Sequence, residues 1–420
     1  YGIYLPPGYE ASTDRYPVIY FLGGVSLDTP SPVVEKLDEM ISTGLIEPTI
    51  LVNPCGDCAA PGVGRWLEFP EVVYESNFMD SELFGAHDTY LAVDVVNHID
   101  STYRTIADRD HRGITGHSRN SLWAVRAALW HPDVFGGAAA LGSVLDWRGF
   151  EFLCGSIAAS QGFRPIDEYE PEPDSTLKSM LSVAATYLPA PDLPPWYLDY
   201  PCTQNGQPIP ALWDTIDVQT ARGVAEQLAV QDLRLRLGIF AAIGDQFGAD
   251  HSAQRFADVL VSQEAAHTLR LYETTEPDPH GDIRPPMFLT FLNPMPSATW
   301  LSPTTWDSGL GSEVVAQIEL PAGLDPADVD PGSVVISEIG GQLLFEPVAA
   351  TVAVVGDGLQ ATFDAGEAVA AGSPYPPGIR ITLEITVRGE MTDGRFFAGS
   401  DTVTLVRAAT PVDPPPVALE

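Results

Sequence analysis

The chain has 420 residues, and its 57 acidic residues against 21 basic ones give a formal net charge of −36. This charge argues against nucleic acid and anionic membranes as partners, and it fits either a salty environment or ordinary solubility. Hydrophobic residues make up 45% of the chain, enough for sizeable cores, and the length predicts two or three domains. No run approaches the ~20 apolar residues of a membrane span.

The first part of the chain alternates between strand-like and helix-like patterns. Pro17 to Leu22 is a continuous apolar run, as in strands that are buried on both faces. Extended runs or strands are predicted at 1–9, 17–22, 49–52, 112–115 and 137–141, and helices at 31–44, 88–103 and 122–130. Strands that alternate with helices favour a right-handed, mainly parallel α/β sheet.

The alternation breaks down over residues 145–232, which are rich in proline and aromatic residues. Because aromatic side chains line many ligand sites, we predict that this insertion is a lid that covers an active site. The alternative is a purely structural excursion of the chain. Trp147, Trp196 and Tyr197 are the candidate substrate-binding residues.

The pattern resumes at 236–243 and then changes again after residue 294. Strands are predicted at 236–243 and 268–273, and helices at 252–262 and 286–292. Beyond 296, apolar residues alternate with others and no helical period intervenes, which predicts an all-β, sandwich-like accessory domain. The expected division is a domain at 1–294, a β-domain at 297–407 and a proline-rich tail at 408–420. We expect no catalytic residue in the β-domain. The sequence does not indicate what this domain binds.

Gly116-His117-Ser118 joins a strand to a helix and reads as most of a G-x-S-x-G nucleophile elbow. Such a turn lifts a serine hydroxyl above the end of a parallel sheet and aims the N-terminus of the next helix at the reaction centre. Asn120 stands where the last glycine of the motif is expected. A serine in an ordinary surface turn is the alternative.

A nucleophilic serine needs a base, and the base needs an orienting carboxylate. In enzymes with this elbow, the three residues follow one another along the chain as serine, acid and histidine. Asp245 directly follows a late strand and His280 follows the last strand, which matches this order. Asp250 is the alternative acid. The expected oxyanion donors are the backbone N–H of Arg119 and that of Gly24 or Val25, although the two glycines at 23 and 24 could also be a plain turn.

The cysteine pattern predicts no metal site, because Cys55 and Cys58 form a C-x-x-C without a second pair at zinc spacing. Two disulfides, Cys55–Cys58 and Cys154–Cys202, would fit a secreted protein, and four reduced cysteines are the alternative. No cofactor is expected. Tyr1 begins inside an expected strand, so we expect that upstream sequence has been removed.

Several stretches together resemble the secreted "putative esterase" family of α/β-hydrolases, which includes feruloyl and acetylxylan esterases, S-formylglutathione hydrolases and mycolyltransferases. They lie at 4–9, 99–105, 112–118, 131–135, 245–248 and 280–281, and so run through nearly all of residues 1–294. The resemblance implies that Ser118 is the nucleophile, His280 the base and Asp245 the acid. The chain has Gly23-Gly24 where the family has His-Gly, and Asn120-Ser121 where it has Gly-Gly.

The resemblance implies a secreted, bacterial serine esterase acting on small-molecule or polymeric esters. The aromatic insertion favours feruloyl-type or other aromatic esters, including synthetic polyesters. Two alternatives stay open: an acyltransferase to a sugar or lipid alcohol using the same triad, and a non-catalytic esterase-like binding protein. Residues 297–407 look like a β-domain appended to secreted bacterial proteins.

Overall fold

The computed structural model describes residues 1–23, 31–54, 77–83, 85–148, 150–160, 175–193, 197–276, 284–307, 313–371 and 379–406. The chain divides into two compact units, Tyr1–Glu39 with Pro48–Phe288, and Met40–Glu47 with Leu289–Glu420.

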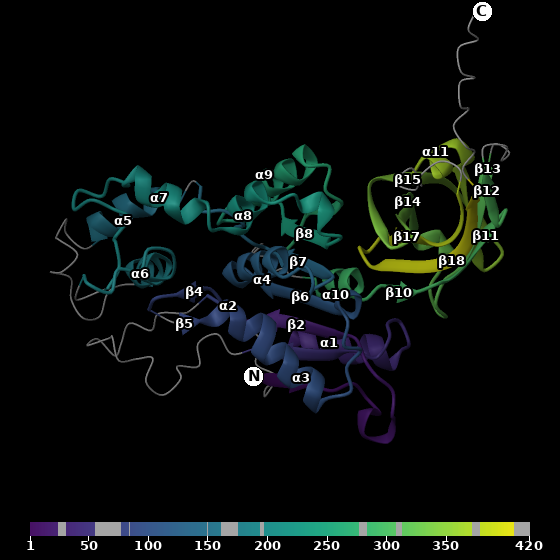
Figure 1. The fold of residues 1–420 in the computed structure, drawn as a ribbon, viewed down its shortest axis with the longest axis horizontal. Coiled ribbons are helices and arrows are strands. Elements are labelled where there is room, and N and C mark those ends of the chain that lie inside the picture. The colour runs from purple at the N-terminus through teal and green to yellow at the C-terminus, as the bar shows by residue number, and fades with distance from the viewer. Residues whose placement is uncertain are drawn as a thin grey trace, which may run out of the picture. The chain divides into compact units, whose positions relative to one another are not determined.

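The first unit is built on a mixed seven-stranded sheet in the order β1-β3-β2-β6-β7-β8-β9 (Figure 1). Its strands are β1 (Gly2–Tyr4), β2 (Val18–Leu22), β3 (Ile50–Asn53), β6 (Arg112–His117), β7 (Gly137–Leu141), β8 (Arg236–Ala242) and β9 (His267–Tyr272). Only the edge pair β1 and β3 is antiparallel among these neighbours. Every residue of β2 and β7 is buried, as expected of strands covered on both faces. A short separate pair consists of β4 (Asp80–Ser81) and β5 (Gly85–Ala86).

Helices α2 to α9 belong to this unit, and α1 and α10 each run from it into the second. They are α1 (Pro32–Ser42), α2 (His87–Thr89), α3 (Val96–Thr102), α4 (Arg119–Trp130), α5 (Phe152–Ser160), α6 (Ser175–Tyr187), α7 (Pro210–Asp217), α8 (Ala221–Gln227), α9 (Ala249–Ser262) and α10 (Pro285–Leu292). Short 3-10 turns occupy 9–11, 109–111 and 230–232. The single helix expected at 88–103 is a composite, because a π-helical stretch, Tyr90–Val95, separates α2 from α3.

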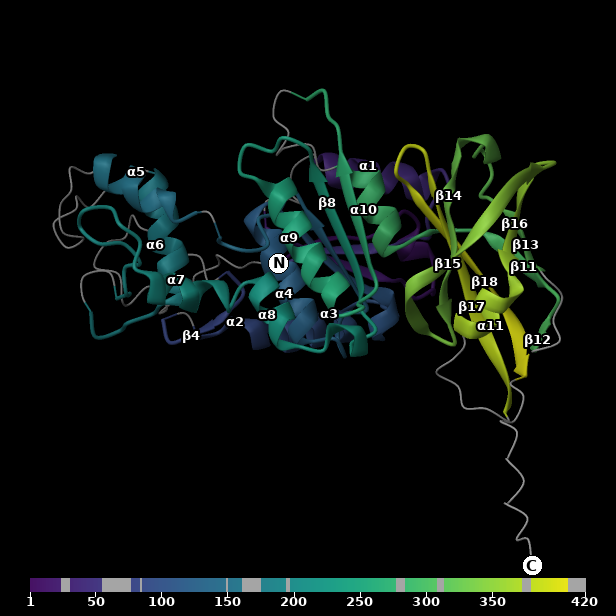
Figure 2. The same ribbon diagram turned by 90° about the horizontal axis from the view of Figure 1, so that it is seen from above.

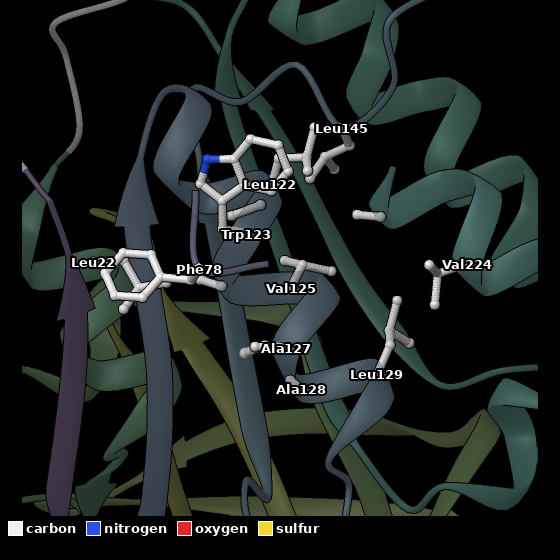
Figure 3. Close-up of a cluster of buried hydrophobic side chains, with 14 of the residues drawn as sticks. Leu22, Phe78, Leu122, Trp123, Val125, Ala127, Ala128, Leu129, Leu145 and Val224 are labelled. Carbon is white, nitrogen blue, oxygen red and sulfur yellow. The ribbon is translucent and has the colours of Figure 1, made fainter. Parts of the chain in front are cut away.

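Helix α4 is central to the core of the first unit. Figure 3 shows its apolar side chains between β2 and α8, and those labelled are Leu122, Trp123, Val125, Ala127, Ala128 and Leu129. Each of these six side chains is almost fully buried. Because the helix packs so closely, the position of its first turn at the end of β6 is well determined by the core.

Residues 145–232, expected as an insertion, contain α5 to α8. Figures 1 and 2 show α5, α6 and α7 grouped beside α4, and the ring of Tyr187 at the end of α6 lies 5.5 Å from that of Trp123. A disulfide joins Cys154 on α5 to Cys202, as expected, with their Cα atoms 5.4 Å apart. Cys55 and Cys58 lie outside the described residues.

The second unit is rich in strands. They are β10 (Met295–Pro296), β11 (Ala298–Ser302), β12 (Thr305–Asp307), β13 (Glu313–Glu319), β14 (Val329–Ile339), β15 (Gln342–Val355), β16 (Gly358–Asp364), β17 (Arg380–Met391) and β18 (Phe396–Val406). The hydrogen-bonded path runs β10-β18-β17-β14-β15-β16-β13-β11, with β12 paired to β18. β15 pairs with β14 up to Ala349 and with β16 from Ala350 onward. The long strand therefore links the two halves of this path.

The expectation that no helix interrupts the β-domain is wrong, because α11 (Ala365–Ala371) follows β16. The helix is short and alanine-rich, and Ala365 and Ala368 are buried. Asp364 accepts a hydrogen bond from Glu367 N (2.9 Å) and so caps its first turn. Among the helices of the described ranges, none is long and apolar enough to cross a membrane.

Candidate active site

The turn between β6 and α4 has the geometry of a strained elbow. Ser118 adopts φ 57° and ψ −134°, a region that residues other than glycine rarely enter, and α4 begins at the next residue. Its backbone N–H donates to the carbonyl of Leu141 on β7 (2.9 Å), and its half-exposed side chain does not cap the helix. The backbone thus places the serine hydroxyl at the carboxyl end of β6, and this hydroxyl is not needed to cap the helix.

Close packing around Gly116 sets the sharpness of this turn. A β-carbon at Gly116 would lie 2.8 Å from the backbone carbonyl of Asn120 and 3.0 Å from that of Leu22. No side chain fits between β6, β2 and the first turn of α4. Glycine is therefore required at the first position of the motif, because any β-carbon there would clash with the backbone.

Ser121, which replaces a glycine of the family pattern, fastens the elbow to the sheet. The side chain is fully buried, and its hydroxyl lies 2.5 Å from Gly116 O and 3.2 Å from Leu141 O. It also accepts a hydrogen bond from Leu141 N at 2.9 Å. A residue that departs from the expected motif thus joins α4 to both β6 and β7.

Asp245 lies beyond the carboxyl end of β8, on the same edge of the sheet as Ser118. The register aligns His117 with Leu141 and Leu141 with Phe240, so the ends of these three parallel strands meet. Asp245 is 7% exposed, and its Oδ1 accepts hydrogen bonds from Phe247 N (2.7 Å) and Ala249 N (3.3 Å). These donors fix the plane of the carboxylate.

Asp250, the alternative acid, is committed to its own loop. Its Oδ2 accepts from Gly244 N (2.9 Å), and its Oδ1 contacts both His251 N (2.8 Å) and His251 Nδ1 (2.9 Å). Burial alone would raise the pKa of Asp250, but the hydrogen bonds from Gly244 and His251 hold that pKa below its ordinary value. The carboxylate stays charged and closes the turn that precedes α9.

A sequence model for the family described as "Putative esterase" matches residues 1–278. The chain belongs to this family. It is a carboxylic ester hydrolase.

Solved structures similar to this esterase are distant relatives in sequence. The CE1 ferulic acid esterase of Anaeromyces mucronatus is 13% identical with a TM-score of 0.39, over 69% of this chain and 82% of that one. An S-formylglutathione hydrolase from Agrobacterium tumefaciens is 15% identical with a TM-score of 0.37, over 64% and 80%. MPT51 of Mycobacterium tuberculosis is 12% identical with a TM-score of 0.36, over 67% and 89%.

Other predicted site residues of the esterase fall outside the described ranges. His280, Gly24, Val25 and Trp196 are among these, so their places stay predictions. Arg119 is the first residue of α4, where backbone N–H groups point away from the helix.

Most other histidines of the esterase are engaged locally. Those with recorded partners pair as His98 with Tyr1, His111 with Asp108, His131 with Asp88, His251 with Asp250 and His267 with the carbonyl of Ala265. The hydrogen bond to Asp88 raises the pKa of His131. Each of the five therefore has a hydrogen-bond partner other than Ser118 and Asp245.

The aromatic residues of the insertion form a row that starts at α4. Trp147 is 9% exposed, donates from Nε1 to Tyr187 Oη (3.2 Å) and packs edge-on against Phe150 at 5.3 Å. Phe150 in turn lies 6.1 Å from Phe152, which is 63% exposed. The row thus runs from buried Trp123, through Tyr187, to the surface. Tyr197 is half-buried and has a positive φ of 54°.

The sequence did not single out three residues that shape the site: Ser121 in the elbow, and Phe150 and Phe152 in the aromatic row. Ser121 was noted only as a departure from the family pattern. Phe150 and Phe152 were noted only as part of an aromatic-rich stretch, although the spacing Trp-x-x-Phe-x-Phe could have indicated a shared surface.

An ion pair between buried Asp146 and partly exposed Arg255 anchors the start of the insertion to α9. Asp146 is fully buried and pairs with Arg255 through two contacts, Nε to Oδ2 at 2.8 Å and Nη2 to Oδ1 at 2.6 Å. Ser252 donates to Asp146 Oδ1 (3.0 Å) and accepts from Leu145 N (2.9 Å). Helix α9 therefore holds both the Asp245 loop at its start and the insertion one turn later.

Proposed function

We propose that this esterase hydrolyses carboxylic esters through a triad of Ser118, Asp245 and His280. The observation that carries the proposal is the backbone of Ser118, held at φ 57° between β6 and α4 with a hydroxyl that does not cap the helix. Strain of this kind at a strand end is typical of an exposed nucleophile.

Asp245 is the proposed acid in preference to Asp250. Both oxygens of Asp250 are used by Gly244 and His251, whereas Asp245 lies directly beyond the carboxyl end of β8, where the backbone N–H groups of Phe247 and Ala249 hold its Oδ1. A carboxylate held in this way can orient an imidazole and stabilise its protonated form.

In the proposed reaction, Ser118 Oγ attacks the acyl carbon while His280 accepts the serine proton. The oxyanion is stabilised by backbone N–H groups of Arg119 and of Gly24 or Val25. The ester C–O bond then breaks, and His280 gives its proton to the leaving alcohol. Water attacks the acyl-enzyme by the reverse sequence and releases the acid.

We further propose that residues 145–232 act as a lid that favours bulky aromatic acyl groups, such as feruloyl-type esters and aromatic polyesters. The aromatic row from Trp123 to exposed Phe152 supports this, because it gives an apolar wall close to α4. Trp147, Trp196 and Tyr197 are the proposed substrate contacts. The Cys154–Cys202 disulfide fits a secreted bacterial protein.

The division into an esterase domain at 1–294, a sandwich-like accessory domain at 297–407 and a tail at 408–420 is likewise proposed. The accessory domain would supply no catalytic group.

The test is turnover of p-nitrophenyl acetate by a Ser118→Ala variant, with Ser101→Ala on the exposed end of α3 as the matched control. We expect Ser118→Ala to lose more than about 10³-fold in kcat and to lose labelling by a fluorophosphonate, while Ser101→Ala keeps both. Retention of most activity by Ser118→Ala would refute the nucleophile assignment. Products analysed with added sugar or lipid alcohols would reveal acyl transfer in place of hydrolysis.

A further inference from the structure

The two departures from the family pattern around the elbow are spatially coupled. A β-carbon built on Gly23, at the end of β2, would lie 2.5 Å from Asn120 Cγ and 2.9 Å from its Oδ1, and closer still to its Nδ2. The carboxamide of Asn120 therefore rests directly on the backbone of Gly23. A larger residue at 23 and Asn120 could not coexist in this arrangement.

The position of this carboxamide relative to Ser118 follows from the strand order. β6 lies between β2 and β7, so the elbow has a β2 side and a β7 side. On the β7 side, polar groups of the elbow hydrogen-bond to the strand: Ser118 N donates to Leu141 O, and Ser121 Oγ accepts from Leu141 N. On the β2 side lies the carboxamide of Asn120, two residues after the nucleophile.

Asn120 is able to contact a bound ligand. Its side chain is partly exposed, and across the described ranges its carboxamide has no hydrogen-bond partner. The carboxamide nitrogen is the atom nearest to the position of a β-carbon on Gly23, which places an N–H donor between the first turn of α4 and the end of β2. A neutral amide at this place can stabilise negative charge without titrating.

We propose that the Asn120 side chain is a catalytic residue that donates a hydrogen bond to the oxyanion formed when Ser118 attacks the ester. This inference rests on the proposed ester hydrolysis and adds a side-chain donor to the backbone ones. The negative charge appears on the former carbonyl oxygen only in the tetrahedral intermediate, so the donor acts on kcat more than on KM. Gly23 has the role of leaving room for this amide.

The experiment compares Asn120→Ala and the nearly isosteric Asn120→Asp with the unaltered protein, using p-nitrophenyl acetate. We expect Asn120→Ala to lower kcat about 10²-fold, with KM changed by less than about threefold, as when other single oxyanion donors are removed. Asn120→Asp should be slower still, because a carboxylate cannot donate and repels the oxyanion. Thermal unfolding should stay within a few degrees of the unaltered protein.

Phenylboronic acid gives a readout that a packing role would not move. Ser118 Oγ adds to boron as its proton passes to the base, which gives a tetrahedral anion that resembles the intermediate. Its affinity should fall in Asn120→Ala by about the same factor as kcat. Activity in Asn120→Asp close to that of the unaltered protein would overturn the inference, as would an unchanged boronate affinity in Asn120→Ala.

Gly23→Ala supplies a second, independent test. The added methyl would displace the carboxamide, whereas the backbone strain at φ 65° is the same with or without Asn120. The rate loss from Gly23→Ala should therefore be clearly smaller in the Asn120→Ala background, and equal losses in both backgrounds would count against the contact. If kcat is unchanged by substitution of Asn120, only this inference is overturned. Absence of turnover and of fluorophosphonate labelling in the unaltered protein overturns the ester-hydrolase proposal together with it.

Discussion

Removing the disulfide between Cys154 and Cys202 should loosen the insertion and leave the sheet intact. Both cysteines are buried, at 1% and 7% exposure, so the matched change is the double substitution Cys154→Ala with Cys202→Ala. Reductant is a poorer choice, since it would also reduce the disulfide predicted between Cys55 and Cys58.

The magnitude follows from the closed loop, whose ends are 48 residues apart. The chain-entropy relation gives about 4 kcal/mol for a loop of this size at 25 °C. Because the bond lies wholly within the insertion, this loss should appear mainly as easier opening of α5 to α7. At about 1.4 kcal/mol per decade, amide exchange there could accelerate by up to about 10³-fold.

The assay is hydrogen exchange of peptides from α5 to α7 compared with peptides from β6 and β7, together with kcat/KM for an aromatic ester and for p-nitrophenyl acetate. We expect faster exchange in the helices alone and a larger loss of activity on the bulky ester, since only that ester needs the aromatic wall. Unchanged exchange would refute the loop argument. Faster exchange with an unchanged ratio of activities would refute the lid proposal.

Two further outcomes test the surroundings of the elbow and of the acid loop. Ser121→Ala should lower the free energy of unfolding by about 1–3 kcal/mol, measured by urea denaturation, because Leu141 N loses its buried acceptor; an unchanged midpoint would contradict this. Asp250→Asn should destabilise by about 1–3 kcal/mol near pH 6, since a carboxylate accepting from Gly244 N is lost. The lowered pKa of Asp250 means that its contribution is present above the ordinary aspartate pKa and disappears as pH falls through the folded-state value. The gap in thermal stability between the two proteins should therefore shrink as pH falls below the ordinary aspartate pKa, and a gap that stays constant with pH would refute the electrostatic reasoning.

The sequence alone determined the kind of most elements of the first unit, except helices α5 to α8 of the insertion, which it did not predict. Continuous apolar runs such as 17–22 and helical periodicity after Ser31-Pro32 depend on local burial and capping, which neighbouring residues largely set. The elbow could also be predicted from the sequence, because Gly-x-Ser at a strand-to-helix junction is typical of a sharp turn. Element ends were less legible: α4 begins at Arg119 rather than near Leu122, since the turn at Ser118 is tighter than hydrophobic periodicity can indicate.

The order of strands and the meaning of the unusual elbow residues came only from the tertiary structure. Pairing β2 with both β3 and β6 joins segments far apart in the chain, and periodicity carries no information about such partners. Helix α11 was missed because a short alanine-rich run between strands has no clear helical period. Asn120 and Ser121 looked like defects in a motif. In the folded chain Ser121 bonds to two strands and Asn120 fills the space above Gly23, because contacts between residues distant in sequence decide which side chains a tight turn can hold.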